Sequence, residues 1–130
     1  MSIQTIMTSD PDGQELVKNA EELGTILKNG NVTRSQMRSI FSEARQIEAT
    51  WGKQSSSLRL SMLKPKLAYQ KSRQGRDSEQ AFGNLVTNLT QAIDTVLEKG
   101  IPEEERDIRF NKLMSYFEAV LAYHRAAGGR

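Results

Sequence analysis

Cysteine is absent from this sequence of 130 residues, and long apolar runs are absent too. Without thiols the chain forms no disulfide framework and none of the usual cysteine-containing zinc sites. No apolar stretch approaches the roughly 18 residues that a membrane-spanning helix requires. The first residues lack the basic start and the apolar block of a secretory signal. We therefore expect a cytoplasmic protein that does not contact membranes.

Groups that carry catalysis are also scarce. His124 is the only histidine, and its place beside Tyr123 favours packing or hydrogen bonding over base catalysis. No phosphate-binding loop and no dinucleotide-binding glycine motif is present. The acidic run from Glu103 to Asp107 falls where a helix is predicted to begin, and acids there complement the helix dipole. We predict no enzymatic activity, no metal site and no cofactor.

Positive charge is confined to the middle of the chain. Residues 33–76 contain ten lysines and arginines but only two acids, Glu43 and Glu48, which gives a formal charge of +8. Residues 1–32 and residues 77–130 each carry −3. Ordinary surface helices mix their charges, so a one-sided segment indicates an anionic partner. A nucleic-acid backbone is the best candidate, because clustered cations are its electrostatic footprint.

Apolar residues recur at spacings of three and four in five segments, and each stripe predicts an amphipathic helix. The stripes begin at Leu16, Met37, Leu60, Phe82 and Phe110. Short polar connections favour antiparallel neighbours. The fold class that we predict is all-α, a compact five-helix bundle forming a single domain over residues 12–127. Residues 1–11 show no period and are predicted to be a mobile tail, and residues 128–130 a frayed C-terminus.

Two predicted helix starts carry capping signals. Asp12 lies three residues before Glu15, a variant of the capping box at the start of the first helix. Thr33 and Gln36 form a T-x-x-Q capping box at the start of the second. The second helix then carries three arginines on one flank: Arg34, Arg38 and Arg45. Such a flank is commonly only solvated, so it becomes informative through the other cations nearby.

The third predicted helix, from about Ser57 to Arg73, concentrates the cations beside a leucine seam. They recur every seven residues in two flanking rows, Arg59, Lys66 and Arg73 on one side and Lys64 and Lys71 on the other. Pro65 lacks a backbone donor and is predicted to kink or break this helix. Tyr69 either stacks on a nucleobase or packs in the core. Trp51 lies on an apolar stripe and is predicted to be a core residue.

Three segments resemble the signature motifs of one protein family. The stretch TRSQMR at residues 33–38 resembles a T-x-S-Q-[LM]-R helix start. The stretch LKPKLAY at residues 63–69, followed by Arg73, resembles the central motif. The stretch FEAVLAYHR at residues 117–125, followed by two glycines, resembles the C-terminal signature. All three occur in the order of the family, which is the small subunit of the type III-A CRISPR–Cas (Csm) interference complex.

The resemblance implies an all-helical, non-catalytic subunit that stacks in several copies beside the subunits holding the guide RNA. Such subunits help to hold target RNA paired with the guide RNA in antiviral defence. The implied partners are a guide RNA–target RNA duplex, the other subunits of the Csm effector complex and further copies of this chain. By motif match the resemblance implies RNA contacts at Arg38, Lys64, Lys66, Tyr69 and Arg73. Charge alone adds Lys53, Arg59, Lys71 and Arg76.

Two other interpretations remain open at the level of sequence. A helix-turn-helix DNA-binding regulator is compatible with the short polar connection between the second and third predicted helices. Against it, rows of lysine and arginine with few asparagines or glutamines contact phosphates rather than read bases. A protein-binding scaffold would use the same basic face to meet an acidic protein partner.

Overall fold

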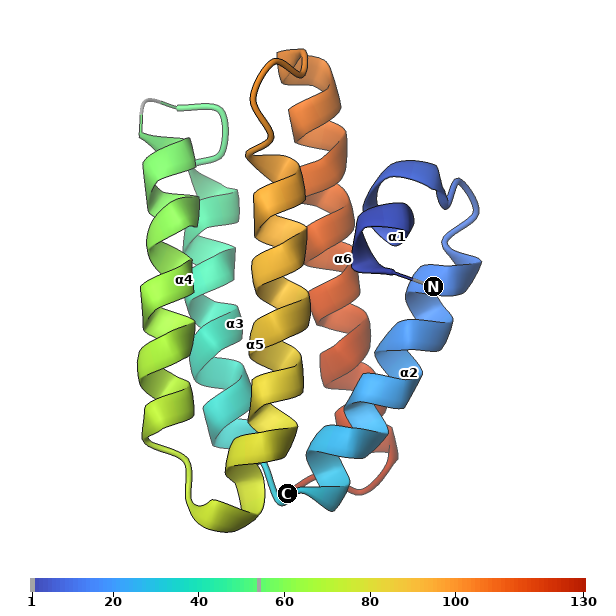
Figure 1. Cartoon of the computed structure of the whole chain (residues 1–130), viewed down its shortest axis with the longest axis vertical. Helices are drawn as coiled ribbons and strands as arrows, with labels where there is room; N and C mark the ends of the chain where they lie inside the picture. The colour runs from blue at the N-terminus through green and yellow to red at the C-terminus, as the bar shows by residue number, and fades with distance from the viewer. Residues whose placement is uncertain (1, 54) are drawn as a thin grey trace.

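Helices account for all regular structure in the part of the chain that the structure describes, residues 2–53 and 55–130. In this computed structural model they are, in order, α1 (Ile3–Ser9), α2 (Gln14–Asn29), α3 (Arg34–Ala49), α4 (Ser56–Ser72), α5 (Arg76–Val96) and α6 (Glu103–Ala126). The predicted all-α class is confirmed. Figure 1 shows α3, α4, α5 and α6 running side by side, while α1 and α2 pack against α5 and α6. None of the described helices is long and apolar enough to cross a membrane.

Helix α1 lies where the sequence predicted a period-free mobile tail, so the predicted count of five helices is wrong: the described part of the chain contains six. Its residues Ile3, Ile6 and Met7 are buried against α5 and α6. The Ser2 hydroxyl caps the helix by accepting a hydrogen bond from the Thr5 N–H at 3.2 Å. The helix spans only seven residues, which is too short for a helical period to stand out in the sequence.

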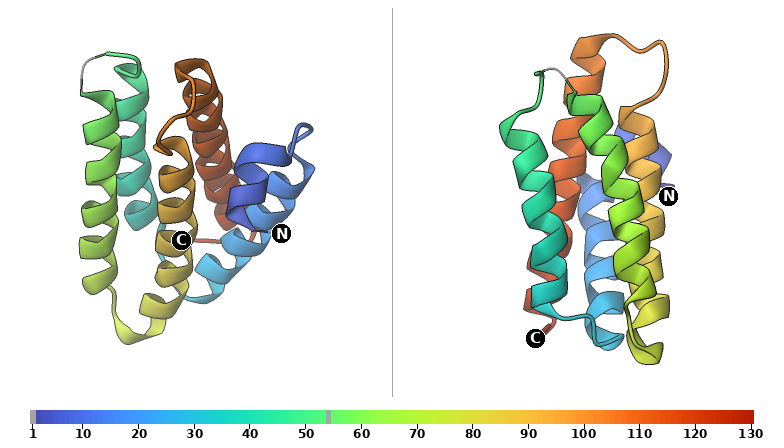
Figure 2. Two further views of the ribbon diagram at one scale, coloured as in Figure 1. Left: turned by 45° about the horizontal axis from the view of Figure 1, so that its top comes forward. Right: turned by 90° about the vertical axis from the view of Figure 1, so that its left-hand side faces the viewer.

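Helix α4 continues without interruption from Ser56 to Ser72 although Pro65 lies inside it. The predicted break therefore does not occur, the predicted kink is not confirmed, and the ribbon is continuous in both views of Figure 2. Proline leaves the carbonyl of Ser61 without its helical N–H partner. Pro65 is exposed and Ser61 is only partly buried, so water can reach that carbonyl.

The capping box at the start of α3 is confirmed, and the cap predicted for α2 is corrected. The Thr33 hydroxyl accepts from the Gln36 N–H at 3.2 Å, and the Gln36 side chain accepts from the Thr33 N–H at 2.8 Å. At α2 the carboxylate of Asp10 does the capping, because it accepts from the Leu16 N–H at 2.9 Å. Asp12, the residue expected from the sequence, is exposed.

Two close approaches hold α6 to α2 and to the connection that follows α2. Gly24 lies on α2 where a Cβ atom would come within 2.7 Å of the Tyr123 Cβ atom and 2.8 Å of the His124 backbone nitrogen. Only a residue without a side chain permits this spacing. The ring of His124 is 1% exposed and hydrogen-bonds through Nε2 to the carbonyl of Val32 at 2.7 Å. The predicted packing and hydrogen-bonding role of His124 is confirmed.

A buried tyrosine joins three helices through polar contacts. The hydroxyl of Tyr116 on α6 donates to Asn19 on α2 and accepts from the side-chain amide of Asn88 on α5 at 3.0 Å. Burial raises the pKa of Tyr116 to about 12, with the Asn88 hydrogen bond opposing and the charge of Glu22 adding to the effect. Tyr116 is therefore a neutral structural group at ordinary pH.

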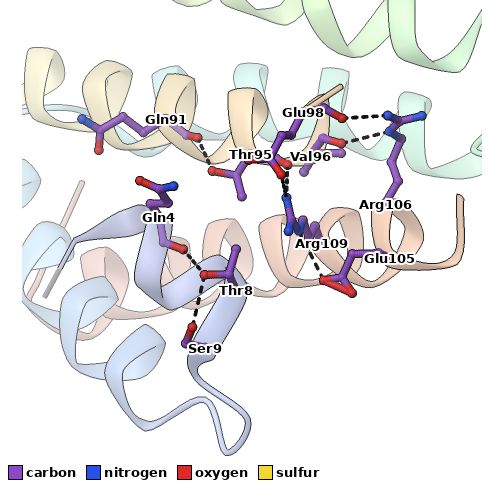
Figure 3. A network of polar contacts seen from close by, with 10 residues as sticks. All are labelled: Gln4, Thr8, Ser9, Gln91, Thr95, Val96, Glu98, Glu105, Arg106 and Arg109. Atoms are coloured by element: carbon purple, nitrogen blue, oxygen red, sulfur yellow. Dashed lines mark hydrogen bonds and ion pairs between the residues drawn. The ribbon is translucent and has the colours of Figure 1, made fainter. Parts of the chain in front are cut away.

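Two arginines of α6 close the C-terminal end of α5, as Figure 3 shows. Arg109 donates to the Thr95 carbonyl at 2.8 Å and lies 3.3 Å from the carboxylates of both Glu98 and Glu105. Arg106 donates to the carbonyls of Val96 and Glu98, at 3.0 Å each. The last carbonyls of a helix lack intrahelical donors, so these two cations have a structural role.

Candidate nucleic-acid interface

Helix α4 presents three distinct faces. Leu60, Leu63 and Leu67 are buried, which confirms the predicted leucine seam. The opposite face carries large apolar side chains in solvent, with Leu58 62%, Met62 50% and Tyr69 58% exposed. The cation rows lie between these two faces. Tyr69 is therefore not a core residue, and its ring is accessible to a ligand.

Each lysine of α4 meets a carboxylate from a neighbouring helix. Lys66 lies 2.9 Å from Glu43 on α3, and on the other side Lys64 pairs with Asp94 of α5. Lys71 lies 3.9 Å from Glu79, also on α5. The sequence around α4 contains no acid, but folding brings the carboxylates of Glu43, Asp94 and Glu79 beside the lysines of α4. Ion pairs this exposed stabilise by about 0–1 kcal/mol, so a phosphate can displace the carboxylate.

Arg59 in α4 and Arg73, which caps its C-terminal end, have no carboxylate within ion-pair distance among the described residues. Arg59 donates to the hydroxyl of Thr50. Arg73 donates to the Tyr69 hydroxyl at 3.0 Å, and its guanidinium carbon lies 5.7 Å from the centre of the Tyr69 ring. The Tyr69 hydrogen bond raises the pKa of Arg73. Arg73 and Tyr69 together form a mixed cationic and aromatic surface.

The groove between α3 and α4 lies beside this surface. Two adjoining hollows of about 290 Å³ and 370 Å³ follow it, and both are lined by Glu43, Met62, Leu63 and Lys66. Tyr69 lines the first hollow and Arg59 the second. Exposed apolar side chains, an aromatic ring and cations thus lie along one groove.

The predicted RNA-contacting residues are divided over several surfaces. Arg59, Lys66 and Tyr69 lie at the α3–α4 groove, whereas Lys64 and Lys71 face α5. Lys53 is exposed in the turn before α4, and Arg76 opens α5 beside a hollow that Lys71 also lines. Arg38 lies apart from the α4 groups, in a separate groove between α3 and α6. That groove also contains Arg34 and Arg125. Sequence analysis placed Arg34 on the arginine flank of the second predicted helix, and it placed Arg125 in the C-terminal motif without predicting an RNA contact there.

Trp51 takes no part in this surface. Its ring stacks on Phe110 with centroids 3.9 Å apart and planes 3° apart, and its Nε1 donates to Asp107 at 2.8 Å. Trp51 is packed against the core, as predicted, although it stays partly exposed. Phe110 covers one face of the indole ring, and Asp107 accepts the hydrogen bond from its N–H group.

Helices α3 and α4 form an antiparallel hairpin. Thr50 pairs with Arg59 near the turn, and Glu43 pairs with Lys66 farther along both helices. The two ribbons lie side by side in Figures 1 and 2. In a helix-turn-helix motif the two helices cross at about 90–120°. The hairpin does not have that arrangement.

The described residues contain no group of three or more histidine, aspartate or glutamate side chains that could hold a metal ion. Nor does any buried side-chain nitrogen or oxygen among them lack a hydrogen-bond partner.

Comparison with known proteins identifies a family. A sequence model of the family described as Csm2 Type III-A matches residues 10–130. No curated protein and no solved structure matches the chain. The match covers nearly the whole chain, including α4 and the arginine-lined groove. The chain belongs to the Csm2 Type III-A family, and it is a small subunit of the type III-A CRISPR effector complex.

Proposed function

We propose that this subunit is a non-catalytic RNA-binding component of the type III-A effector. It stacks in several copies and holds target RNA paired with the guide RNA in antiviral defence. Its contacts are made to phosphates and are independent of sequence. The RNA-binding residues that we propose are Arg38, Lys53, Arg59, Lys64, Lys66, Tyr69, Lys71, Arg73 and Arg76.

The observation that carries this proposal is the outer side of α4. Arg59 and Arg73 are exposed there without carboxylate partners among the described residues. Lys66 lies between them in the same row and is 53% exposed in spite of its ion pair. Residues seven apart on a helix are about 10 Å apart along its axis, so the row can follow several phosphates. Tyr69 adds an accessible ring on which a base can stack.

Two rival interpretations receive less support. The antiparallel α3–α4 hairpin lacks the crossed geometry of a helix-turn-helix. An acidic protein partner would also fit a cationic row, but it gives no reason for the exposed ring of Tyr69 beside Arg73. An RNA strand, which has both phosphates and bases, accounts for both groups.

The test is RNA binding by a variant with charge reversals at Arg59, Lys66 and Arg73. We expect its affinity for several unrelated RNAs to fall together, because phosphate contacts carry no sequence information. A matched control reverses Lys18, Lys99 and Lys112, which lie outside the α4 surface. Equal affinities of the α4 variant and the control at low and moderate salt would show that this face does not bind RNA. A strong preference of the unaltered protein for one DNA duplex would favour a regulator instead.

A further inference from the structure

The groove between α3 and α6 is a second cationic feature, separate from the α4 surface. It encloses about 490 Å³. Arg34 and Arg38 line it from α3, and Arg125 lines it from α6. The rest of its lining is His124 and the apolar residues Met37, Phe41, Leu121, Ala122 and Ala126, which we call the apolar floor. The short side chains of the two alanines leave the space between the helices open.

The charge in this groove is not balanced from within. None of the residues that line it carries a carboxylate side chain. None of its three arginines has an ion-pair partner among the described residues, whereas Lys64, Lys66 and Lys71 on α4 each have one. Three uncompensated guanidinium groups around one hollow create a local positive potential. An anion entering the groove would therefore meet no competing carboxylate side chain among the residues that line it.

Arg34 is held in position before any ligand arrives. Its Nε atom donates to the carbonyl of Gly129 at 2.8 Å, and its backbone N–H donates to a main-chain oxygen of Arg130, the last residue of the printed sequence. Its two terminal nitrogens make no hydrogen bond within the described part of the chain. Arg34 is also the first residue of α3, whose first turn contains no acid. The positive end of the helix dipole therefore adds to the cationic potential there.

The groove matches the chemistry of a nucleotide unit. Guanidinium groups bind phosphate oxygens through two parallel N–H donors. Phe41 is half-buried, and the apolar floor around it is suited to a ribose or a base. The enclosed volume falls within the range of about 300–1,000 Å³ that is usual for small-ligand sites. A bare inorganic anion would leave this floor uncovered.

We propose that the α3–α6 groove is a second RNA-binding site, in which Arg34, Arg38 and Arg125 hold backbone phosphates. This proposal rests on the proposed RNA-binding function and adds a contact point that lies across α3 from the α4 row. Arg38 belongs to this groove and not to the α4 surface. Each subunit therefore contacts RNA on both sides of α3.

The experiment compares two double variants that remove the same charge. Arg38→Gln with Arg125→Gln empties the groove of two cations, while Lys18→Gln with Lys99→Gln removes two exposed cations elsewhere. Arg34 is left intact because it holds the C-terminal segment. The probe is a fluorescently labelled RNA, both single-stranded and annealed to its complement. Binding is followed by anisotropy between about 50 mM and about 200 mM salt.

We expect the groove variant to bind at least about tenfold more weakly than the control variant. Its plot of log K against log salt concentration should also lose about 1.4–1.8 units of slope, for two phosphate contacts. The single variant Arg125→Lys keeps the charge but loses the planar guanidinium fork, so its RNA affinity should lie between those of the groove variant and the control variant. Unchanged thermal unfolding midpoints would establish that all variants are folded.

The outcomes separate this proposal from the proposed function. If the groove variant matches the control in affinity and slope while an α4 variant binds weakly, the groove proposal is wrong and the α4 function stands. If the unaltered protein binds neither form of the RNA, both proposals are wrong. If polyglutamate displaces the RNA from the groove as effectively as unlabelled RNA does, the groove serves an acidic protein segment instead.

Discussion

Replacing Glu43 by glutamine is expected to strengthen RNA binding. The Glu43 carboxylate lies 2.9 Å from the ammonium group of Lys66, and the two side chains are 40% and 53% exposed. If Lys66 contacts a phosphate, that phosphate and Glu43 compete for the same cation. Glu43→Gln removes the competitor and one negative charge beside the groove between α3 and α4.

The size of the effect follows from the exposure of the pair. An ion pair open to solvent stabilises by about 0–1 kcal/mol, and 1 kcal/mol corresponds to about fivefold in an equilibrium constant. We therefore expect affinity to rise by about two- to fivefold at low salt. The gain should shrink as salt is raised, because exposed charges are screened. Folding stability should fall by no more than about 1 kcal/mol.

The assay is a double-mutant cycle with Lys66→Gln, read by fluorescence anisotropy on a labelled RNA. Glu21→Gln is the matched control, because Glu21 is an exposed acid on α2 and its loss changes the net charge equally. In the Lys66→Gln background, Glu43→Gln should have no greater effect than Glu21→Gln. The coupling between the two sites then measures the competition directly.

One result would refute the reasoning. If Glu43→Gln binds RNA no more tightly than Glu21→Gln, Lys66 does not contact phosphate. The row of Arg59, Lys66 and Arg73 would then have no phosphate contact at its middle residue, and the proposed path of the RNA along α4 would be wrong.

Three further predictions concern the fold and are tested by denaturation. Tyr116→Phe should lower the free energy of unfolding by about 1–2 kcal/mol at neutral pH. The pKa of Tyr116 is about 12 in the folded state and 10.0 ordinarily, so its contribution to stability is full below pH 10.0, and about 2–3 kcal/mol is lost as the pH rises from 10.0 to about 12. The phenylalanine variant should not show this loss. Gly24→Ala would bring a Cβ atom within 2.7 Å of the Tyr123 Cβ atom, so we expect it to lower the free energy of unfolding by about 1–3 kcal/mol, and an unchanged value would contradict the close approach of α2 and α6. Asp10→Ala should cost about 1 kcal/mol through loss of the α2 cap, whereas Asp12→Ala should stay within about 0.5 kcal/mol, and the reverse order would show that the wrong aspartate has been assigned.

Local patterns in the sequence predicted local structure well. The capping box of Thr33 and Gln36 involves residues three apart, so its geometry follows once the helix begins. The leucine seam of α4 follows in the same way from spacings of three and four. Both patterns depend only on the period of the helix.

Contacts between distant segments could not be predicted in this way. Glu43 and Asp94 lie 23 and 30 residues from the lysines that they neutralise. The sequence near α4 therefore seemed free of acids, although the folded surface is not. Arg125 and Arg38 line the same groove because α6 packs against α3. No pattern within either segment carries that information.

The cap of α2 shows a subtler failure. Asp12 had the spacing of a capping residue, but the chain turns at Gly13 with φ +73°. That turn brings the carboxylate of Asp10 to the open N–H groups of α2 instead. Spacing alone could not distinguish two aspartates placed two residues apart.

The measurement that most directly tests RNA contact by this subunit is ultraviolet crosslinking of the assembled effector loaded with target RNA, followed by mass spectrometry of the peptides. We predict RNA adducts on the α4 peptide that contains Tyr69, whose ring is 58% exposed, and on the α3 peptide that contains Phe41. Adducts that occur only on other subunits, or in this chain only on α2 and α5, would contradict the account.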